Sequence, residues 1–126
     1  MSLSHGSMLS ERVIRLSIEV HRQLGPGLLQ SAYEECLCFE LGRAGIGHSR
    51  QVPLPIVYKK VRLDCGYRTD LIVQAELIVE INAVEWLLLL QDAQILTYLR
   101  LSQHRVALLL NFNNIYLRDG IRRFVL

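Results

Sequence analysis

At 126 residues, the chain is long enough for one domain with a single hydrophobic core. Hydrophobic residues make up 51% of it, which excludes an intrinsically disordered chain. The formal net charge is only +2, so composition alone gives no strong electrostatic signal for nucleic-acid binding. The opening residues are small and polar, so we expect residues 1–8 to be a cloning-derived or disordered segment and residues 9–126 to form one domain.

The sequence predicts neither a membrane span nor a zinc site. Apolar runs such as Trp86 to Leu90 are far too short to cross a bilayer. No secretory signal is visible at the N-terminus, so we expect a cytoplasmic protein. The histidines form no His-x-x-x-His pair and the three cysteines lack metal-ligand spacing, which argues against zinc.

Helical periodicity dominates the first third of the chain. Apolar residues recur at helical spacing from Ser10 to Leu24, and Gly25-Pro26-Gly27 ends this predicted amphipathic helix. A second helix is predicted from Leu28 to Leu41. The segment 48–59 contains two prolines, which favours an edge strand or an irregular strand start.

Strand patterns dominate the rest of the chain. Leu71 to Val73 and Leu77 to Val84 predict two strands joined by a tight turn, at the centre of a sheet. After them we expect a helix from Gln91 to Leu101 and a strand from Val106 to Asn111. Further short strands are expected at 116–117 and 121–126. This order indicates an α/β fold.

Three polar side chains in the central strands need a physical explanation. Glu80 and Asn82 lie two residues apart in an otherwise apolar strand, so they project from the same face. Asp70 enters from the neighbouring strand. Burying an unpaired carboxylate is costly, and two carboxylates aimed at one point suit a hard divalent cation. The alternative for Asp70 is a salt bridge to Arg68 or Arg62.

A family resemblance covers the chain from about residue 16 to 126. Val61 to Val73 (VRLDCGYRTDLIV), then Glu80-Ile81-Asn82, then Gln94 to Leu99 (QILTYL) resemble the GxxExxY family, small bacterial proteins within the PD-(D/E)XK nuclease superfamily. The motif that names the family aligns with Gly27 to Tyr33, where Gln30 replaces the glutamate. The resemblance implies a restriction-endonuclease-like core, a mixed central sheet flanked by helices.

The resemblance also implies Mg²⁺-dependent hydrolysis of phosphodiester bonds in nucleic acid. In the family, an Asp at position 70 and a Glu at position 80 bind Mg²⁺, and a lysine two residues later activates the attacking water. Here that lysine is Asn82. In related nucleases, residues at the positions of Gln94 and Tyr98 line the active-site edge. The alternative is that Gln94 bridges strand ends while Tyr98 packs in the core.

Asn82 and Gln30 are both neutral where the family carries charge. We therefore expect a catalytically impaired nuclease with weakened Mg²⁺ binding at Asp70 and Glu80. One alternative is a rearranged active site in which Arg68 or Lys60 supplies the missing cation. Another is a non-catalytic module that binds nucleic acid or protein.

Two surface features remain open at this point. The five consecutive apolar residues Trp86 to Leu90 favour a core segment, and the alternative is an exposed homodimer contact. Two basic groups could contact phosphates, although a solvated surface is the favoured interpretation for both. They are Lys59, Lys60 and Arg62, and Arg118, Arg122 and Arg123.

Overall fold

The computed structural model describes residues 5–126, with side chains from residue 8 onward. In chain order the elements are α1 (His5–Leu24), α2 (Gln30–Arg43), β1 (His48–Pro53), β2 (Ile56–Tyr58), β3 (Val61–Leu63), β4 (Arg68–Val73), β5 (Leu77–Asn82), α3 (Leu89–Ser102), β6 (Val106–Asn111), the 3₁₀ turn η1 (Leu117–Gly120) and β7 (Ile121–Val125). Of the segment 1–8 that the sequence sets apart, residues 1–4 lie outside the described residues and residues 5–8 belong to α1.

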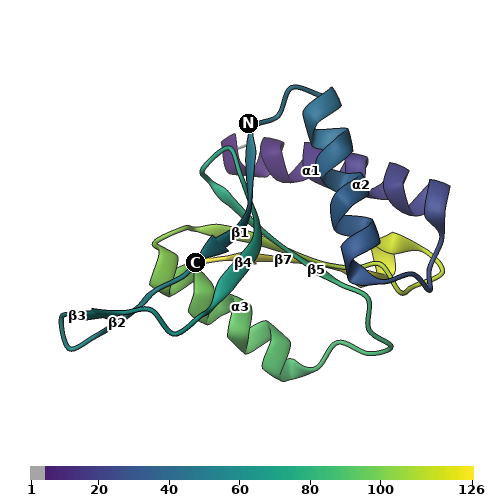
Figure 1. The fold of residues 1–126 in the computed structure, drawn as a ribbon. Coiled ribbons are helices and arrows are strands. Elements are labelled where there is room, and N and C mark those ends of the chain that lie inside the picture. Colours follow the sequence, from purple (N-terminus) through teal and green to yellow (C-terminus); the bar gives the residue numbers. More distant parts are fainter. Residues whose placement is uncertain (1–4) are drawn as a thin grey trace.

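A five-stranded mixed sheet in the order β1-β4-β5-β6-β7 forms the centre of the fold. Only β5 and β6 run parallel, and α3 connects them across one face of the sheet. Helices α1 and α2 cover the opposite face (Figure 1). The predicted α/β class, with a mixed sheet flanked by helices, is therefore confirmed, and β5 is the central strand.

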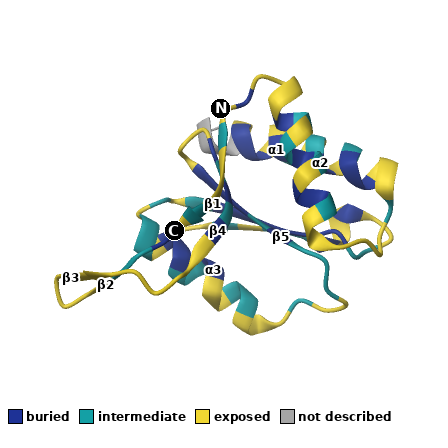
Figure 2. Cartoon of the chain, viewed as in Figure 1, coloured by how far each residue is buried: buried dark blue, intermediate teal, exposed yellow. Residues whose placement is uncertain are grey.

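The core has one layer on each face of the sheet, and β5 contributes to both. Leu77, Val79 and Ile81 belong to the larger layer beneath α1 and α2. Ile78 belongs to the smaller layer beneath α3. Because side chains alternate along a strand, Glu80 and Asn82 project toward the α3 side with Ile78. The burial colouring shows the central strands as the most deeply covered part of the chain (Figure 2).

The structure corrects two expectations. Trp86 to Leu90 is not a core segment, because Trp86, Leu88, Leu89 and Leu90 are all exposed and only Leu87 packs against the α3 layer. The physical reason is that α3 first buries side chains at Ile95, so its first turn and the loop before it receive no cover from the sheet. The expected strand at 116–117 is also absent, since Leu117 begins η1.

Other elements agree with the sequence. β1 is an edge strand, as its proline content predicts, and β6 has the predicted bounds. Within the described part of the chain, no helix combines the length and apolar character needed to cross a membrane.

Candidate active site

Asp70 and Glu80 lie in a fork where β4 and β5 separate. The two strands pair from Val73 opposite Leu77 as far as Leu71 opposite Val79. Beyond that point carboxylates replace backbone partners. The N–H of Ile81 donates to Asp70 Oδ2 at 2.8 Å, and the N–H of Asp70 donates to Glu80 Oε1 at 3.3 Å. The strands thus hold both carboxylates at one point.

Burial makes these two carboxylates hard to ionise together. Burial raises the pKa of Asp70, and the hydrogen bond from the Ile81 N–H opposes that shift. Burial, and after it the negative charge of Asp70, raises the pKa of Glu80 to about 9. The pair therefore retains a proton at neutral pH unless a cation replaces it.

The donor set of the fork fits a hard divalent cation. Mg²⁺ commonly takes one or two carboxylates from the protein and completes its shell with water and phosphate oxygens. Asp70 and Glu80 supply that number. Among the described residues, no group of three or more His, Cys, Asp and Glu side chains could hold a metal ion. In the part of the chain that the structure describes, Asp70 forms no ion pair with an arginine. Arg68 instead donates to the Gln51 carbonyl oxygen at 3.3 Å.

A small pocket of about 40 Å³ lies beside Glu80 on the α3 side. Five polar residues line it, namely Glu80, Asn82, Gln91, Gln94 and Tyr98. The apolar Ile95 and Leu109 complete the lining. Gln94 Nε2 donates to the Tyr98 hydroxyl at 2.8 Å, and burial raises the pKa of that hydroxyl. The lining contains no lysine or arginine.

The two cations considered as substitutes for the missing lysine lie elsewhere. Arg68 is bound to the Gln51 carbonyl as described, and Lys60 belongs to the turn between β2 and β3, which projects from the molecule (Figure 1). Neither side chain lines the pocket beside Glu80.

Helix α2 brings Gln30 to the other side of the fork. Gln30 is the first residue of α2, and its Nε2 atom lies 3.4 Å from Asp70 Oδ2. Glu34 follows one turn later and is only 6% exposed. It pairs with Arg50 at 2.8 Å. The sequence did not single out Glu34, although its position one turn from Gln30 placed it on the same helix face.

Gln51 is a site residue that no local sequence pattern predicts. Its Nε2 atom donates to Glu34 Oε1 at 3.0 Å and to Asp70 Oδ1 at 3.4 Å. It lies between Arg50, which pairs with Leu71 of β4, and Val52, which pairs with Thr69, so it is level with Asp70. Its φ of 49° is in the left-handed region, which costs about 1–3 kcal/mol for a non-glycine residue. This strained residue links two carboxylates.

We expect Gln51→Gly to separate the strain at this position from its role at the fork. Glycine relieves the strain but loses both hydrogen bonds, so the free energy of unfolding in EDTA should change by less than about 1 kcal/mol. Mn²⁺ affinity should fall about tenfold, because Asp70 loses an orienting partner. Chemical denaturation and calorimetric titration with Mn²⁺ measure the two effects.

Gln74→Gly is the matched control, since Gln74 has a φ of 53° in the exposed turn between β4 and β5. It should stabilise the fold and leave Mn²⁺ affinity unchanged. Wild-type Mn²⁺ affinity in Gln51→Gly would show that the Gln51 amide does not support Asp70.

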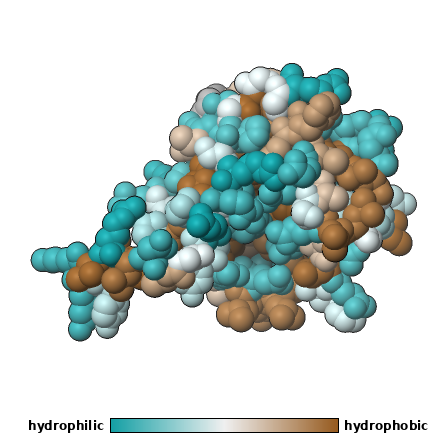
Figure 3. All heavy atoms as spheres, viewed as in Figure 1, coloured by the Kyte–Doolittle hydropathy of each residue, from teal (hydrophilic) through white to brown (hydrophobic). Residues whose placement is uncertain are grey.

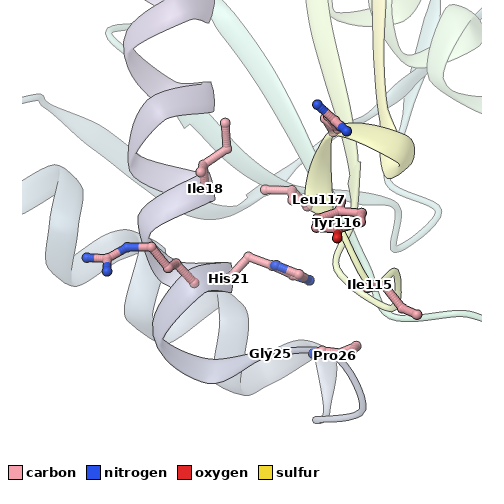
Figure 4. Close-up of a pocket in the computed structure, with 9 residues that line it drawn as sticks. Ile18, His21, Gly25, Pro26, Ile115, Tyr116 and Leu117 are labelled. Atoms are coloured by element: carbon pink, nitrogen blue, oxygen red, sulfur yellow. The ribbon is translucent and has the colours of Figure 1, made fainter.

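A larger pocket of about 560 Å³ lies apart from these residues, between the end of α1 and the loop before η1. Figure 4 shows His21 pointing from α1 toward this loop, and its Nε2 atom lies 2.7 Å from the Asn114 carbonyl oxygen. The lining includes Pro26 and Tyr116 but no carboxylate. Despite its size, this pocket offers His21 alone as a metal-ligating side chain, and that ring already contacts the Asn114 carbonyl oxygen.

Comparison with known proteins identifies one protein family. The family model described as "PD-(D/E)XK nuclease superfamily" matches residues 7–124, nearly the whole chain. Searches of curated proteins and of solved structures each gave no significant match. The five-stranded mixed sheet flanked by helices is consistent with this family match. The chain therefore belongs to the PD-(D/E)XK nuclease superfamily.

Proposed function

We propose that this chain is a degenerate nuclease of the GxxExxY type, which retains a weakened divalent-metal site and has lost most phosphodiester hydrolysis. One observation carries the proposal. The pocket beside Glu80 presents Asn82, Gln91, Gln94 and Tyr98 but no lysine or arginine. A phosphoryl-transfer site needs positive charge where negative charge develops, and here the protein supplies none.

Each residue has a definite role in this proposal. Asp70 and Glu80 would hold the cation, which when bound would supply Lewis-acid activation of water and of a phosphoryl oxygen. Gln30, beside Asp70, contributes an amide where a carboxylate would add charge, so cation affinity falls. Asn82 donates hydrogen bonds but carries no positive charge and exchanges no proton near neutral pH. Asparagine in place of the family's lysine is expected to lower the cleavage rate on the order of a hundredfold.

The experiment that tests the proposal compares wild type with Asp70→Ala on single- and double-stranded DNA and RNA, in Mg²⁺ and in Mn²⁺. We expect no cleavage by wild type above the Asp70→Ala background. Cleavage by wild type that disappears in Asp70→Ala would overturn the impairment and direct the search to a substitute cation such as Arg68.

Thermal unfolding tests the metal site separately from cleavage. Mn²⁺ should raise the melting temperature of wild type, because a ligand that binds only the folded state stabilises it. The shift should be absent in Asp70→Ala and larger in Gln30→Glu, which restores the carboxylate beside Asp70. Equal shifts in all three proteins would place cation binding elsewhere on the chain.

A second candidate function is association through the exposed segment Trp86 to Leu90, for which a homodimer is the simplest form. Trp86, Leu88, Leu89 and Leu90 are exposed by 73%, 62%, 84% and 75%. Figure 3 shows apolar surface in the region where α3 begins. Single exposed apolar residues are common on proteins, whereas a contiguous group of them is typical of an interaction surface.

We expect Leu89→Glu/Leu90→Glu to convert a dimer to a monomer in light scattering coupled to size exclusion. Acidic residues in the first turn of α3 are compatible with the helix, so the fold should survive. The matched control is Leu29→Glu/Ile115→Glu, which changes two equally exposed residues elsewhere. A monomeric wild type would contradict the homodimer.

A further inference from the structure

Strands β2 and β3 form a ribbon that the five-stranded sheet does not include. We call residues 54–67 the β2–β3 ribbon. It projects away from the sheet and the helices (Figure 1), and its strands are coloured as exposed in Figure 2. A two-stranded hairpin alone is at best marginally stable in water. We therefore expect the ribbon to be stabilised by contact with a binding partner.

The ribbon carries a concentrated positive charge. Lys59, Lys60 and Arg62 lie within four positions, and Asp64 is the one acidic residue of the ribbon. Asp64 accepts a hydrogen bond from the Gly66 N–H at 3.0 Å, at the root of the ribbon and away from the turn. No ion pair involves these three cations among the residues that the structure describes. Their charge is therefore available to an external polyanion.

The second basic group differs, because internal contacts hold its side chains. Arg122 donates to both oxygens of Asp92 at 2.7 Å, and Arg123 Nε lies 3.4 Å from Ser10 Oγ. Arg118 lies over the Tyr116 ring at 5.4 Å. In the ribbon, Lys59 lies over the neighbouring Tyr58 ring at 5.6 Å. Among the described residues, no hydrogen bond or ion pair holds Lys59, Lys60 or Arg62, so the ribbon is the basic group whose cations are the less engaged by the fold.

The two faces of the ribbon are unlike. Ile56 pairs with Leu63 and Tyr58 with Val61, which puts four apolar side chains on one face. The opposite face has the pair of Val57 with Arg62. Lys59 and Lys60 occupy the turn. A duplex groove matches this arrangement, since its walls are lined with phosphates and its floor offers bases and sugars for apolar contact.

The root of the ribbon is fixed to the candidate active site. The N–H of Leu54 donates to the Tyr67 carbonyl oxygen at 2.8 Å, which closes the base of the ribbon. The Tyr67 ring meets the Tyr98 ring edge to face, with centroids 6.4 Å apart. Tyr98 lines the pocket beside Glu80, and Asp70 follows Tyr67 by three residues. A polyanion long enough to run from the turn to the root of the ribbon would therefore reach both carboxylates.

We infer that the β2–β3 ribbon holds a DNA duplex across the carboxylate fork, and this inference rests on the proposed nuclease descent. From Leu54 to Lys59 the ribbon reaches about 17 Å, which is the rise of about 5 base pairs. The major groove of B-form DNA admits a two-stranded ribbon, whereas the deep, narrow major groove of A-form RNA does not. With cations in its turn and no bidentate base-reading side chain in β2 or β3 except Arg62, the ribbon grips backbone more than sequence.

The test is fluorescence anisotropy with a labelled DNA duplex of about 20 base pairs, several times the reach of the ribbon, in EDTA so that no chemistry occurs. Lys59→Ala/Lys60→Ala/Arg62→Ala should weaken binding at least tenfold and lower the salt slope of log K by about 2.7. Its melting temperature should match wild type, because these side chains are exposed. Lys59→Arg/Lys60→Arg retains the charges and should bind like wild type.

The matched control is Arg12→Ala/Arg15→Ala/Arg43→Ala, which removes the same charge from exposed positions on α1 and α2. Screening at physiological salt should limit its effect to less than about threefold. Equal losses in the control and ribbon variants would overturn the inference. So would wild-type affinity for duplex RNA or single-stranded DNA as high as for duplex DNA. A wild-type dimer that the ribbon variant dissociates would assign the ribbon to a second copy of the chain.

Failure of this inference is distinguishable from failure of the proposed function. Glu80→Gln should retain duplex affinity in EDTA while it loses the Mn²⁺ shift in melting temperature. The ribbon variant should show the reverse behaviour, with a normal Mn²⁺ shift and weakened duplex binding.

Discussion

Asn82→Lys should raise metal-dependent cleavage at least a hundredfold over wild type. Asn82 projects into the pocket beside Glu80, two residues further along β5, so a lysine there extends its ammonium group toward the position of a bound phosphate. The backbone of Asn82 needs no change, because its carbonyl oxygen keeps the hydrogen bond from the Phe112 N–H. The measurement is initial cleavage rate of plasmid and oligonucleotide substrates in Mg²⁺ and Mn²⁺.

Two variants make the gain interpretable. Asn82→Met has a similar length without charge and should stay at the wild-type rate, which separates charge from packing. Asp70→Ala in the Asn82→Lys background should remove the gain, which ties it to the fork. A folded Asn82→Lys protein that binds Mn²⁺ but cleaves no faster than Asn82→Met would show that position 82 does not limit the chemistry.

In a chelating buffer, the free energy of unfolding should fall as pH rises from about 5 to about 9. Glu80 has a pKa of about 9 in the folded state, against an ordinary value of 4.5, so the folded chain holds a proton that the unfolded chain has lost. More protons are bound when folded, and stability therefore decreases with pH, by at most about 1.4 kcal/mol per pH unit. The raised pKa of Asp70 acts in the same direction. Chemical denaturation across this range measures the slope.

Glu80→Gln should flatten this dependence, since a neutral amide takes the place of the titrating group. Glu85→Gln, an exposed carboxylate a few residues further along the chain, is the matched control and should keep the wild-type slope. Saturating Mn²⁺ should reverse the trend, because the cation replaces the proton and binds better as pH rises. A wild-type slope in Glu80→Gln would show that another residue holds the buried proton.

The sequence by itself determined the parts of the site that depend on local periodicity. Alternation along β5 puts Glu80 and Asn82 on one face, and the short β4–β5 hairpin brings Asp70 to the same end of that strand. Neighbouring strands joined by a tight turn leave few registers open, so these positions followed from residue spacing. The loss of charge at Asn82 and Gln30 was likewise visible from residue types alone.

Tertiary structure decided what depends on distant pairing and on where elements end. Gln51 reaches Asp70 only because β1 returns to pair with β4, a long-range register that no local pattern encodes. The apolar residues Trp86 to Leu90 predict a core segment, yet most of them are exposed. The first turn of α3 lies outside the area that packs against the sheet, since α3 buries side chains only from Ile95 onward. The β2–β3 ribbon has strand-like residues, and only the fold shows that it leaves the sheet with its apolar face and its cations in solvent. Burial is a property of the whole assembly, and local spacing alone does not set it.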